Sequence, residues 1–423
     1  MNEQFATLII DGAEVKLPIV IGTRGEKAID ITSLRKTTGY VTLDPSLANT
    51  AECKSAISFV DGENGVLLYR GYPIEDLVNI ADFVKVAYLL INGELPTPEQ
   101  DKNFRENLNE NSMLHEGIRH FFDRFPLTSK PMTMLSTMFN AQSSFYENVD
   151  LLSLTERIEK TAARVISSTR TMAAFTYRKI NGLPVNQPRH DLTFCANFLH
   201  MMFDSPVKPY IVEPEAERIL NILFILHAEH SSNCSCHTVT TIGSAQANLY
   251  AALSAGISAL SGPLHGGANE AVCQMLRDIQ NKYNGNVRAF LDQVKLKKEK
   301  AFGFGHRVYK TYDPRAMIIK KETHQFLEAM NLNDPFLDLA QELEEIALHE
   351  DYFLERNLYP NVDFYSGVIY RALGIPESFF TMMFALARLP GWIAHWTAMR
   401  DVNTKICRPR EIYTGLDVRH CNR

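Results

Sequence analysis

The pattern of hydrophobic and polar positions changes character near residue 65. Before that point, ATLIIDGAEVKLPIVIG and SAISFVDGENGVLLYRGY each contain two runs rich in β-branched and aromatic residues around a turn sequence. Asp11-Gly12 and Asp61-Gly62 stand at these turns, and Asp-Gly is a strong hairpin signal because both residues tolerate positive φ. The pattern therefore predicts a small β module over residues 1–65.

Beyond Ile74 the hydrophobic residues recur at helical spacing instead. The segment EDLVNIADFVKVAYLLING predicts a helix that ends at Gly93, ahead of two prolines. The segment AERILNILFILH has almost no polar face, which indicates a buried helix. Nearly everything that follows is helical in pattern, with loops marked by proline. The predicted fold class is mainly α.

Three of the 13 histidines stand beside small or glycine residues in the central part of the chain. His230 follows the buried helix, His265 lies in GPLHGGANEAV, and His306 lies in FGFGHRVYK. Small residues let a substrate approach the backbone closely. A new helix is predicted to begin near Ala268, and its free amides favour a neutral imidazole at His265. This stretch is a candidate active site.

A zinc cluster is an alternative interpretation of the first part of this stretch. Its ligands would be His227, His230, Cys234, Cys236 and His237. Neither a C-x-x-C pair nor an H-x3–5-H pair completes the set, and structural zinc sites are usually built from such pairs. For His227 we favour a core or helix-end histidine, and no metal is expected.

Asp363 lies in LYPNVDFYSGVIYRALGIP, where Pro360 precedes a predicted helix. The ordinary role for an aspartate at such a place is the N-cap, which would also keep the carboxylate ionised beside helix amides. A carboxylate with neutral histidines also suits enolisation, in which a base removes a proton beside a carbonyl and a donor stabilises the oxygen. The two roles are compatible.

Basic residues supply candidate anion sites. Arg315, Arg388 and Arg408 each lie near a proline, and a guanidinium group can hold a carboxylate in a two-pronged fork. Together they suit a small dianion or trianion, although the surface is the usual place for arginine. A lysine-rich stretch around His306 suits a polyphosphate ligand. The alternative is that these basic side chains simply form a solvent-exposed surface. The stretch contains Lys295, Lys297, Lys298, Lys300, Arg307 and Lys310.

Length and composition narrow the class of protein. The 423 residues suffice for two or three domains, and the net charge of -6 argues weakly against a nucleic-acid partner. Seven cysteines without a regular framework indicate reduced thiols. The first residues lack the features of a signal peptide, and no apolar run approaches the roughly 20 residues of a membrane span. We expect a cytoplasmic protein without a membrane or nucleic-acid partner.

Four segments resemble the signature segments of the citrate synthase family, in the family's order and spacing. They are GPLHGGANEAV, FGFGHRVYKTYDPRA, YPNVDFYSGVIYRALGIP and ARLPGWIAHW. The resemblance covers essentially the whole chain, and the N-terminal extension is similar to that of type II enzymes, the hexameric class of Gram-negative bacteria. It implies a homodimer with a shared active site, assembled further into a homohexamer.

The resemblance also implies the citrate synthase fold, with a large and a small helical domain beside the β module. The expected divisions are residues 1–65 for the β module, 66–265 with 371–423 for the large domain, and 266–370 for the small domain. The implied reaction condenses acetyl-CoA with oxaloacetate and water to give citrate and CoA, as in the tricarboxylic acid cycle. This is the activity of a citrate (Si)-synthase, an acyltransferase without a cofactor. The alternative is 2-methylcitrate synthase, which uses propionyl-CoA.

Individual roles follow from the resemblance. Asp363 would take a proton from the acetyl-CoA methyl group, His265 would stabilise the enol, and His306 would protonate the oxaloacetate carbonyl. Oxaloacetate or citrate would be held by His230, Arg315, Arg388 and Arg408, the last across a dimer interface. Acetyl-CoA would be contacted by Gly303, Lys310 and Asn361.

One region departs from type II enzymes that NADH inhibits allosterically. Arg164 is kept, but Glu110 and Asn111 stand where arginine and histidine are expected, and Ser168 replaces a lysine. An acidic residue repels dinucleotide phosphates. We therefore predict that inhibition by NADH is weak or absent.

Overall fold

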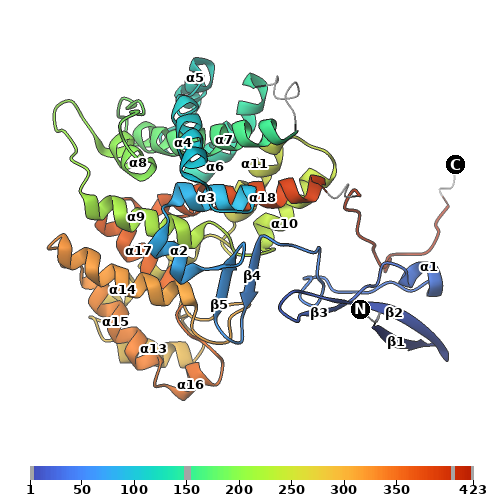
Figure 1. Cartoon of the computed structure of the whole chain (residues 1–423). Helices are drawn as coiled ribbons and strands as arrows, with labels where there is room; N and C mark the ends of the chain where they lie inside the picture. Colours follow the sequence, from blue (N-terminus) through green and yellow to red (C-terminus); the bar gives the residue numbers. More distant parts are fainter. Residues whose placement is uncertain (1–3, 147–153, 402–404, 421–423) are drawn as a thin grey trace. The chain divides into compact units, whose positions relative to one another are not determined.

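The computed structural model describes residues 4–146, 154–401 and 405–420. They fall into two compact units, one of Met1–Ser55 with Cys407–Arg423 and one of Ala56–Ile406. Helices dominate the second unit, and strands occur in both (Figure 1). The fold class predicted from the sequence, mainly α with a small N-terminal β part, is confirmed.

The first unit contains a three-stranded antiparallel sheet in the order β1-β2-β3, formed by Phe5–Ile10, Ala13–Ile21 and Lys27–Ile29. The turn between β1 and β2 is the predicted Asp11-Gly12 pair, with φ of 50° and 80°. Positive φ at both positions matches the right-handed twist of the strands. A short helix, α1 (Leu34–Thr38), contributes Leu34 to a small core with β2.

A second three-stranded sheet, β4 (Ser58–Asp61), β5 (Val66–Tyr69) and β6 (Tyr72–Pro73), belongs to the second unit. The predicted hairpin after Asp61 is present, with a four-residue loop at 62–65. Asp61 shapes this loop by accepting hydrogen bonds from the amides of Glu63 and Asn64, both at 3.0 Å. The boundary predicted at residue 65 lies within this loop. The division into a β module and two helical domains stays a prediction.

The helices of the second unit follow the predicted periodicity, with one correction. The helix expected up to Gly93 is two helices, α2 (Ile74–Ile80) and α3 (Phe83–Asn92). Asp82 begins the second one, because its carboxylate accepts the amide of Lys85 at 3.0 Å. Gly93 ends it as predicted, with φ of 97°.

The remaining helices enclose one large core. They are α4 (Pro98–Glu110), α5 (Glu116–Arg124), α6 (Pro131–Gln142), α7 (Leu154–Ile180), α8 (Phe194–Phe203), α9 (Pro214–His227), α10 (Cys234–Ser244), α11 (Leu249–Leu260), α12 (Ala268–Lys282), α13 (Val287–Lys295), α14 (Pro314–Ala329), α15 (Pro335–Ala347), α16 (Asp351–Leu354), α17 (Asp363–Ala372) and α18 (Phe380–Asp401). Helix α18 is buried along most of its length and packs against α3, α7, α9, α10 and α11 (Figure 1).

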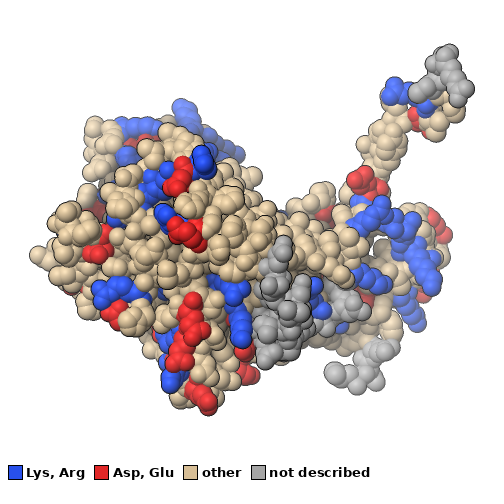
Figure 2. All heavy atoms as spheres, turned by 90° about the horizontal axis from the view of Figure 1, so that it is seen from above, with Lys and Arg blue, Asp and Glu red and all other residues tan. Residues whose placement is uncertain are grey.

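The surface carries both signs of charge. Figure 2 shows basic and acidic side chains interspersed over the visible face of the described residues. Within the described part of the chain, no helix is both long and apolar enough to span a bilayer.

Candidate active site

His265 lies in the turn between α11 and α12, and its ring contacts the start of α10. The amide of Ser235 donates to Nε2 at 3.2 Å, and the Ser235 hydroxyl lies 2.9 Å from the same atom. Because Nε2 accepts the amide proton, the neutral ring carries its own proton on Nδ1. Burial lowers the pKa of His265 to about 4, and the positive charge of Arg388 acts in the same direction. The predicted neutral imidazole follows mainly from burial.

His306 has the opposite tautomer. The amides of Val308 and Tyr309 donate to its Nδ1 at 3.0 and 3.2 Å, so the neutral ring carries its proton on Nε2. Burial lowers the pKa of His306 to about 4, and Arg315 contributes. His306 is therefore a neutral donor at neutral pH.

His230 lies against His306, and the structure brings these two predicted residues together. Their ring centroids are 5.1 Å apart, and the Tyr309 hydroxyl lies 3.2 Å from His230 Nε2. Burial lowers the pKa of His230 well below its usual value, helped by Arg315, His306 and Arg388. An uncharged imidazole can donate to a carbonyl or carboxylate oxygen without adding charge.

Arg315 is already paired within the chain. Its Nε donates to Asp313 Oδ1 at 3.0 Å, and a terminal guanidinium nitrogen donates to Oδ2 at 2.8 Å. Both side chains are almost fully buried, at 3% and 1% exposure. Asp313 raises the pKa of Arg315 against the effect of burial. The fork thus holds a buried guanidinium in one orientation beside His230 and His306.

Arg388 comes from the buried helix α18. Its Nε donates to the carbonyl oxygen of His227, and its guanidinium lies over the Phe384 ring, 4.6 Å from the centroid. Burial lowers its pKa, while Glu229 opposes the shift. Its positive charge acts on His230, His265 and Asp363.

Asp363 is the first residue of α17, not its N-cap. Val362 is the capping residue, and no side chain caps the helix there. The side chain of Asn361 accepts a hydrogen bond from the amide of Asp363 at 3.0 Å. The Asp363 carboxylate accepts no backbone amide at this helix start. None of the described residues donates a hydrogen bond to it. The prediction that Asp363 caps the helix is wrong, and burial raises the pKa of its carboxyl group to about 6.

The residues predicted to contact acetyl-CoA form two groups. Asn361 is joined to the glycine loop, since its amide donates to Gly303 O and its side chain to Gly305 O, both at 2.9 Å. Lys310 is exposed beside His306, and its backbone amide donates to Gly62 O at 2.9 Å. Lys295, from the same basic stretch, pairs with Glu350 at 2.8 Å.

The remaining two residues singled out from the sequence are Arg408 and His227. Arg408 belongs to the first unit and is exposed, so its place across a dimer interface stays a prediction. His227 is fully buried at the end of α9, where its Nδ1 lies 2.7 Å from Leu223 O, as expected for a core histidine. The described residues contain no group of three or more side chains placed to bind a metal.

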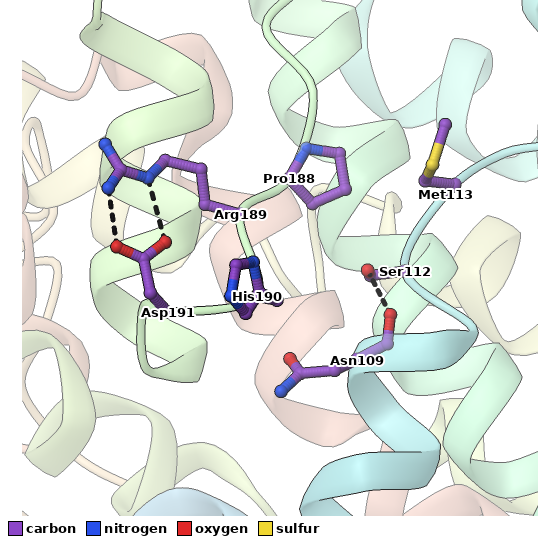
Figure 3. A pocket seen from close by; sticks show the side chains of 7 residues that line it. All are labelled: Asn109, Ser112, Met113, Pro188, Arg189, His190 and Asp191. Carbon is purple, nitrogen blue, oxygen red and sulfur yellow. Dashed lines mark hydrogen bonds and ion pairs between the residues drawn. The ribbon is translucent and has the colours of Figure 1, made fainter.

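A pocket of about 680 Å³ lies away from these residues (Figure 3). Its lining comprises Asn109, Ser112, Met113, Pro188, Arg189, His190 and Asp191. Arg189 and Asp191 point toward each other within it, with contacts of 3.0 and 2.5 Å. The pocket therefore offers no unpaired arginine for an anion.

Residues 110 and 111, which depart from the type II enzymes, lie next in sequence to the pocket residues Asn109 and Ser112. Arg164 donates to Asn111 Oδ1 at 3.1 Å and lies over the Tyr146 ring, 4.4 Å from the centroid. Ser168 is buried and donates to Val165 O at 3.4 Å. The retained arginine is thus engaged by neutral groups.

The residues that hold the site in place were not identified from the sequence. Asp313 precedes Pro314 and Arg315, and an aspartate before a proline signals a helix N-terminus, so this one was detectable. Glu229 is fully buried and lies 3.0 Å from His395 Nε2, and no local pattern marks that pair because 166 residues separate them.

Comparison with known proteins decides the family. A model of the citrate synthase C-terminal domain matches residues 46–410. Citrate synthase 1 of Mycobacterium tuberculosis (strain H37Rv) is 48% identical over 421 residues, covering 99% of this chain and 97% of that protein. Citrate synthase of Corynebacterium glutamicum is 44% identical over 98% of this chain and 95% of that protein.

The chain belongs to the citrate synthase family. Solved citrate synthases share its fold. The enzyme of Pyrobaculum aerophilum has a TM-score of 0.82 at 32% identity, covering 96% of both chains. The enzyme of Thermoplasma acidophilum, solved in a ternary complex with carboxymethyl coenzyme A and oxaloacetate, has a TM-score of 0.82 at 27% identity, covering 90% of this chain and 98% of that one. The predicted citrate synthase fold and the predicted enzyme class, a citrate (Si)-synthase and hence a transferase, are confirmed.

Proposed function

We propose that the chain condenses acetyl-CoA with oxaloacetate and water to give citrate and CoA. The observation that carries this proposal is the set of ionisation states beside Arg315 and Arg388. Two histidines are neutral donors with opposite tautomers, and one carboxylate, Asp363, has a pKa raised to about 6 without a hydrogen-bond donor among the described residues. Enolisation of a thioester needs a base and a neutral donor in these ionisation states.

The first step takes a proton from the methyl group of acetyl-CoA. Asp363 accepts this proton, since a carboxylate whose pKa lies near the working pH is a more effective base than an ordinary aspartate. The Nδ1–H of His265 donates to the thioester oxygen and stabilises the enol. The hydrogen bond from this neutral donor stabilises the negative charge that develops on the thioester oxygen as the methyl proton leaves.

The second step forms the carbon–carbon bond. The enol carbon attacks the oxaloacetate carbonyl, and His306 supplies a proton to the carbonyl oxygen from Nε2. Arg315 and Arg388 hold the two carboxylates, with His230 as an uncharged donor, and Arg408 completes the set from a second subunit. Water then hydrolyses the thioester of citryl-CoA and releases citrate and CoA. Lys310, Gly303 and Asn361 hold the CoA portion.

The experiment that tests this function measures thiol release from acetyl-CoA and from propionyl-CoA, each with oxaloacetate. The relatives named above are citrate synthases, which favours acetyl-CoA as the substrate. A preference for propionyl-CoA would move the assignment to 2-methylcitrate synthesis. An absence of thiol release from either substrate would contradict the proposal.

We further propose a homodimer with a shared site that assembles into a homohexamer of the type II class. The N-terminal β part supports this, but the bacterial relatives named above are Mycobacterium and Corynebacterium enzymes, so the Gram-negative subclass rests on the resemblance of the N-terminal extension alone. Light scattering on the purified protein gives the subunit number directly. Titration of activity with NADH tests the predicted weak response, which inhibition at low micromolar NADH would contradict.

A further inference from the structure

The hairpin formed by β4 and β5 contacts the backbone on both sides of His230. The Ser58 hydroxyl donates to Glu229 Oε1 at 3.0 Å and accepts the amide of Ser231 at 3.2 Å. From β5, the Tyr69 hydroxyl donates to Glu229 O at 2.8 Å and accepts the Glu229 amide at 3.2 Å. The open end of the hairpin therefore fixes residues 229 and 231, which flank the histidine.

The loop of the same hairpin lies against the segment that follows His306. Gly62 O accepts the amide of Lys310 at 2.9 Å. A Cβ atom on Gly62 would lie only 2.1 Å from the carbonyl oxygen of Val308. Since the φ of Gly62 lies outside the left-handed region, the close approach, and not the backbone conformation, requires glycine here.

The contacted segment also sets the state of His306. The amides of Val308 and Tyr309 donate to His306 Nδ1 and thereby select the Nε2–H tautomer. The Tyr309 hydroxyl reaches His230, whose ring lies 5.1 Å from that of His306. A shift of the Val308 peptide would therefore disturb both the tautomer and the distance between the two rings.

We propose that the β4–β5 hairpin is a positioning element for the two histidines that face oxaloacetate. Its strand ends place His230, and its Gly62 loop holds His306 in the tautomer that donates from Nε2. The kinetic consequences rest on the function proposed above, whereas the tautomer of His306 can be observed without any reaction.

The first test is Gly62→Ala, with Gly71→Ala as the matched control. Gly71 lies in the next turn of the same sheet with φ of 91°, and no atom lies within 4 Å of the position that a Cβ would take there. Alanine at residue 71 therefore strains the backbone without touching the His306 segment. We expect Gly62→Ala to lower kcat by about 10- to 100-fold, because small misplacements of reacting groups cost rates of that order. Gly71→Ala should keep the kcat of wild type.

The second test separates the two ends of the hairpin. Ser58→Ala removes the contacts to residues 229 and 231, so we expect it to raise the KM for oxaloacetate roughly 10-fold with a smaller change in kcat. NMR of protein labelled with 15N-histidine should show that Gly62→Ala alters the ring-nitrogen shifts of His306, assigned with His306→Gln. Gly71→Ala should leave those shifts unchanged.

The outcomes are distinct. Unchanged His306 shifts and kcat in a folded Gly62→Ala variant would overturn the proposal, as would equal effects of both glycine substitutions. If Gly62→Ala does not fold, Ser58→Ala and Tyr69→Phe decide: a raised KM for oxaloacetate supports the proposal, and a wild-type KM overturns it. A wild type that releases no thiol would sink the proposed function alone, because the NMR result stands independently.

Discussion

An aspartate stands at the start of both α14 and α17, as the N-cap Asp313 and as the first helical residue Asp363, and the two carboxylates lie in opposite surroundings. Asp313 caps α14 and accepts hydrogen bonds from the Arg315 amide, the Arg315 guanidinium and the Val362 amide. The Asp363 carboxylate accepts none from the described residues, and burial raises its pKa to about 6. The same residue type at the start of a helix is thus either a fixed counter-ion or an available base, depending on the donors around it.

The largest expected effect comes from removing the available base. Asp363→Asn should lower kcat by about 10²- to 10⁴-fold, the usual contribution of a general base. Thiol release at saturating substrates measures it. Oxaloacetate binding by calorimetry serves as the control, since the asparagine leaves Arg315 and its partner in place. A kcat within a few-fold of wild type would exclude Asp363 as the base.

Asp313→Asn should instead act on stability. It leaves the buried Arg315 guanidinium without its counter-ion, and breaking a buried pair in this way costs about 3–5 kcal/mol. Denaturant unfolding measures the loss, and the KM for oxaloacetate should rise because the orientation of Arg315 is no longer fixed. A variant as stable as wild type would show that other groups balance the arginine.

The pH dependence sharpens the contrast between the two carboxylates. Because the pKa of Asp363 is about 6, kcat should fall as the pH drops below that value and the base becomes protonated. The folded state holds this proton more tightly than the unfolded chain, so the ionised carboxylate destabilises the fold above pH 6. Asp363→Asn should therefore raise Tm at pH 7.5, and its advantage should shrink toward pH 4. A lower Tm than wild type at pH 7.5 would contradict this sign.

The smallest effect is expected at Arg189 and Asp191, an exposed ion pair that resembles the buried pair of Arg315 and Asp313. Arg189 and Asp191 have the same two-residue separation as Asp313 and Arg315, and similar contacts, but they are about half exposed. Asp191→Asn should leave kcat, KM and Tm unchanged, since solvent screens exposed pairs. A clear loss of activity would mean that the pocket of Figure 3 affects the reaction.

The parts that could be predicted from the sequence depend on neighbours along the chain. The Asp11-Gly12 turn and the end of α3 at Gly93 follow from residues within a few positions, and the structure confirms both. The signature segments contain His265, His306 and Asp363, and His230 was indicated by its place after a buried helix. The structure brings His230 against His306, and the charge of Arg315 or Arg388 acts on each of the four residues.

The parts that could not be predicted depend on contacts between distant residues. The sequence predicted Asp363 as a helix cap because an aspartate commonly takes that position. In the structure Val362 is the N-cap, and Asn361 accepts the amide of Asp363. The pKa of about 6 arises from burial, which no local pattern reveals. The tautomer of His265 depends on Ser235, 30 residues earlier, and only the packed structure brings the two together.

The hairpin that holds His230 and His306 is synthesised long before either histidine. Ser58 precedes its partner Glu229 by 171 residues, and the segment held by Gly62 follows later still. During translation the hairpin is synthesised before Glu229 and the segment at Lys310, the partners that it contacts in the folded protein. Contacts between residues so distant in sequence form slowly, because a long loop must close first. A chain that ends before residue 310 therefore lacks the contacts that orient His230 and His306. We expect such a chain not to hydrolyse a CoA thioester. Competence for the reaction is acquired only when nearly the whole polypeptide has been made.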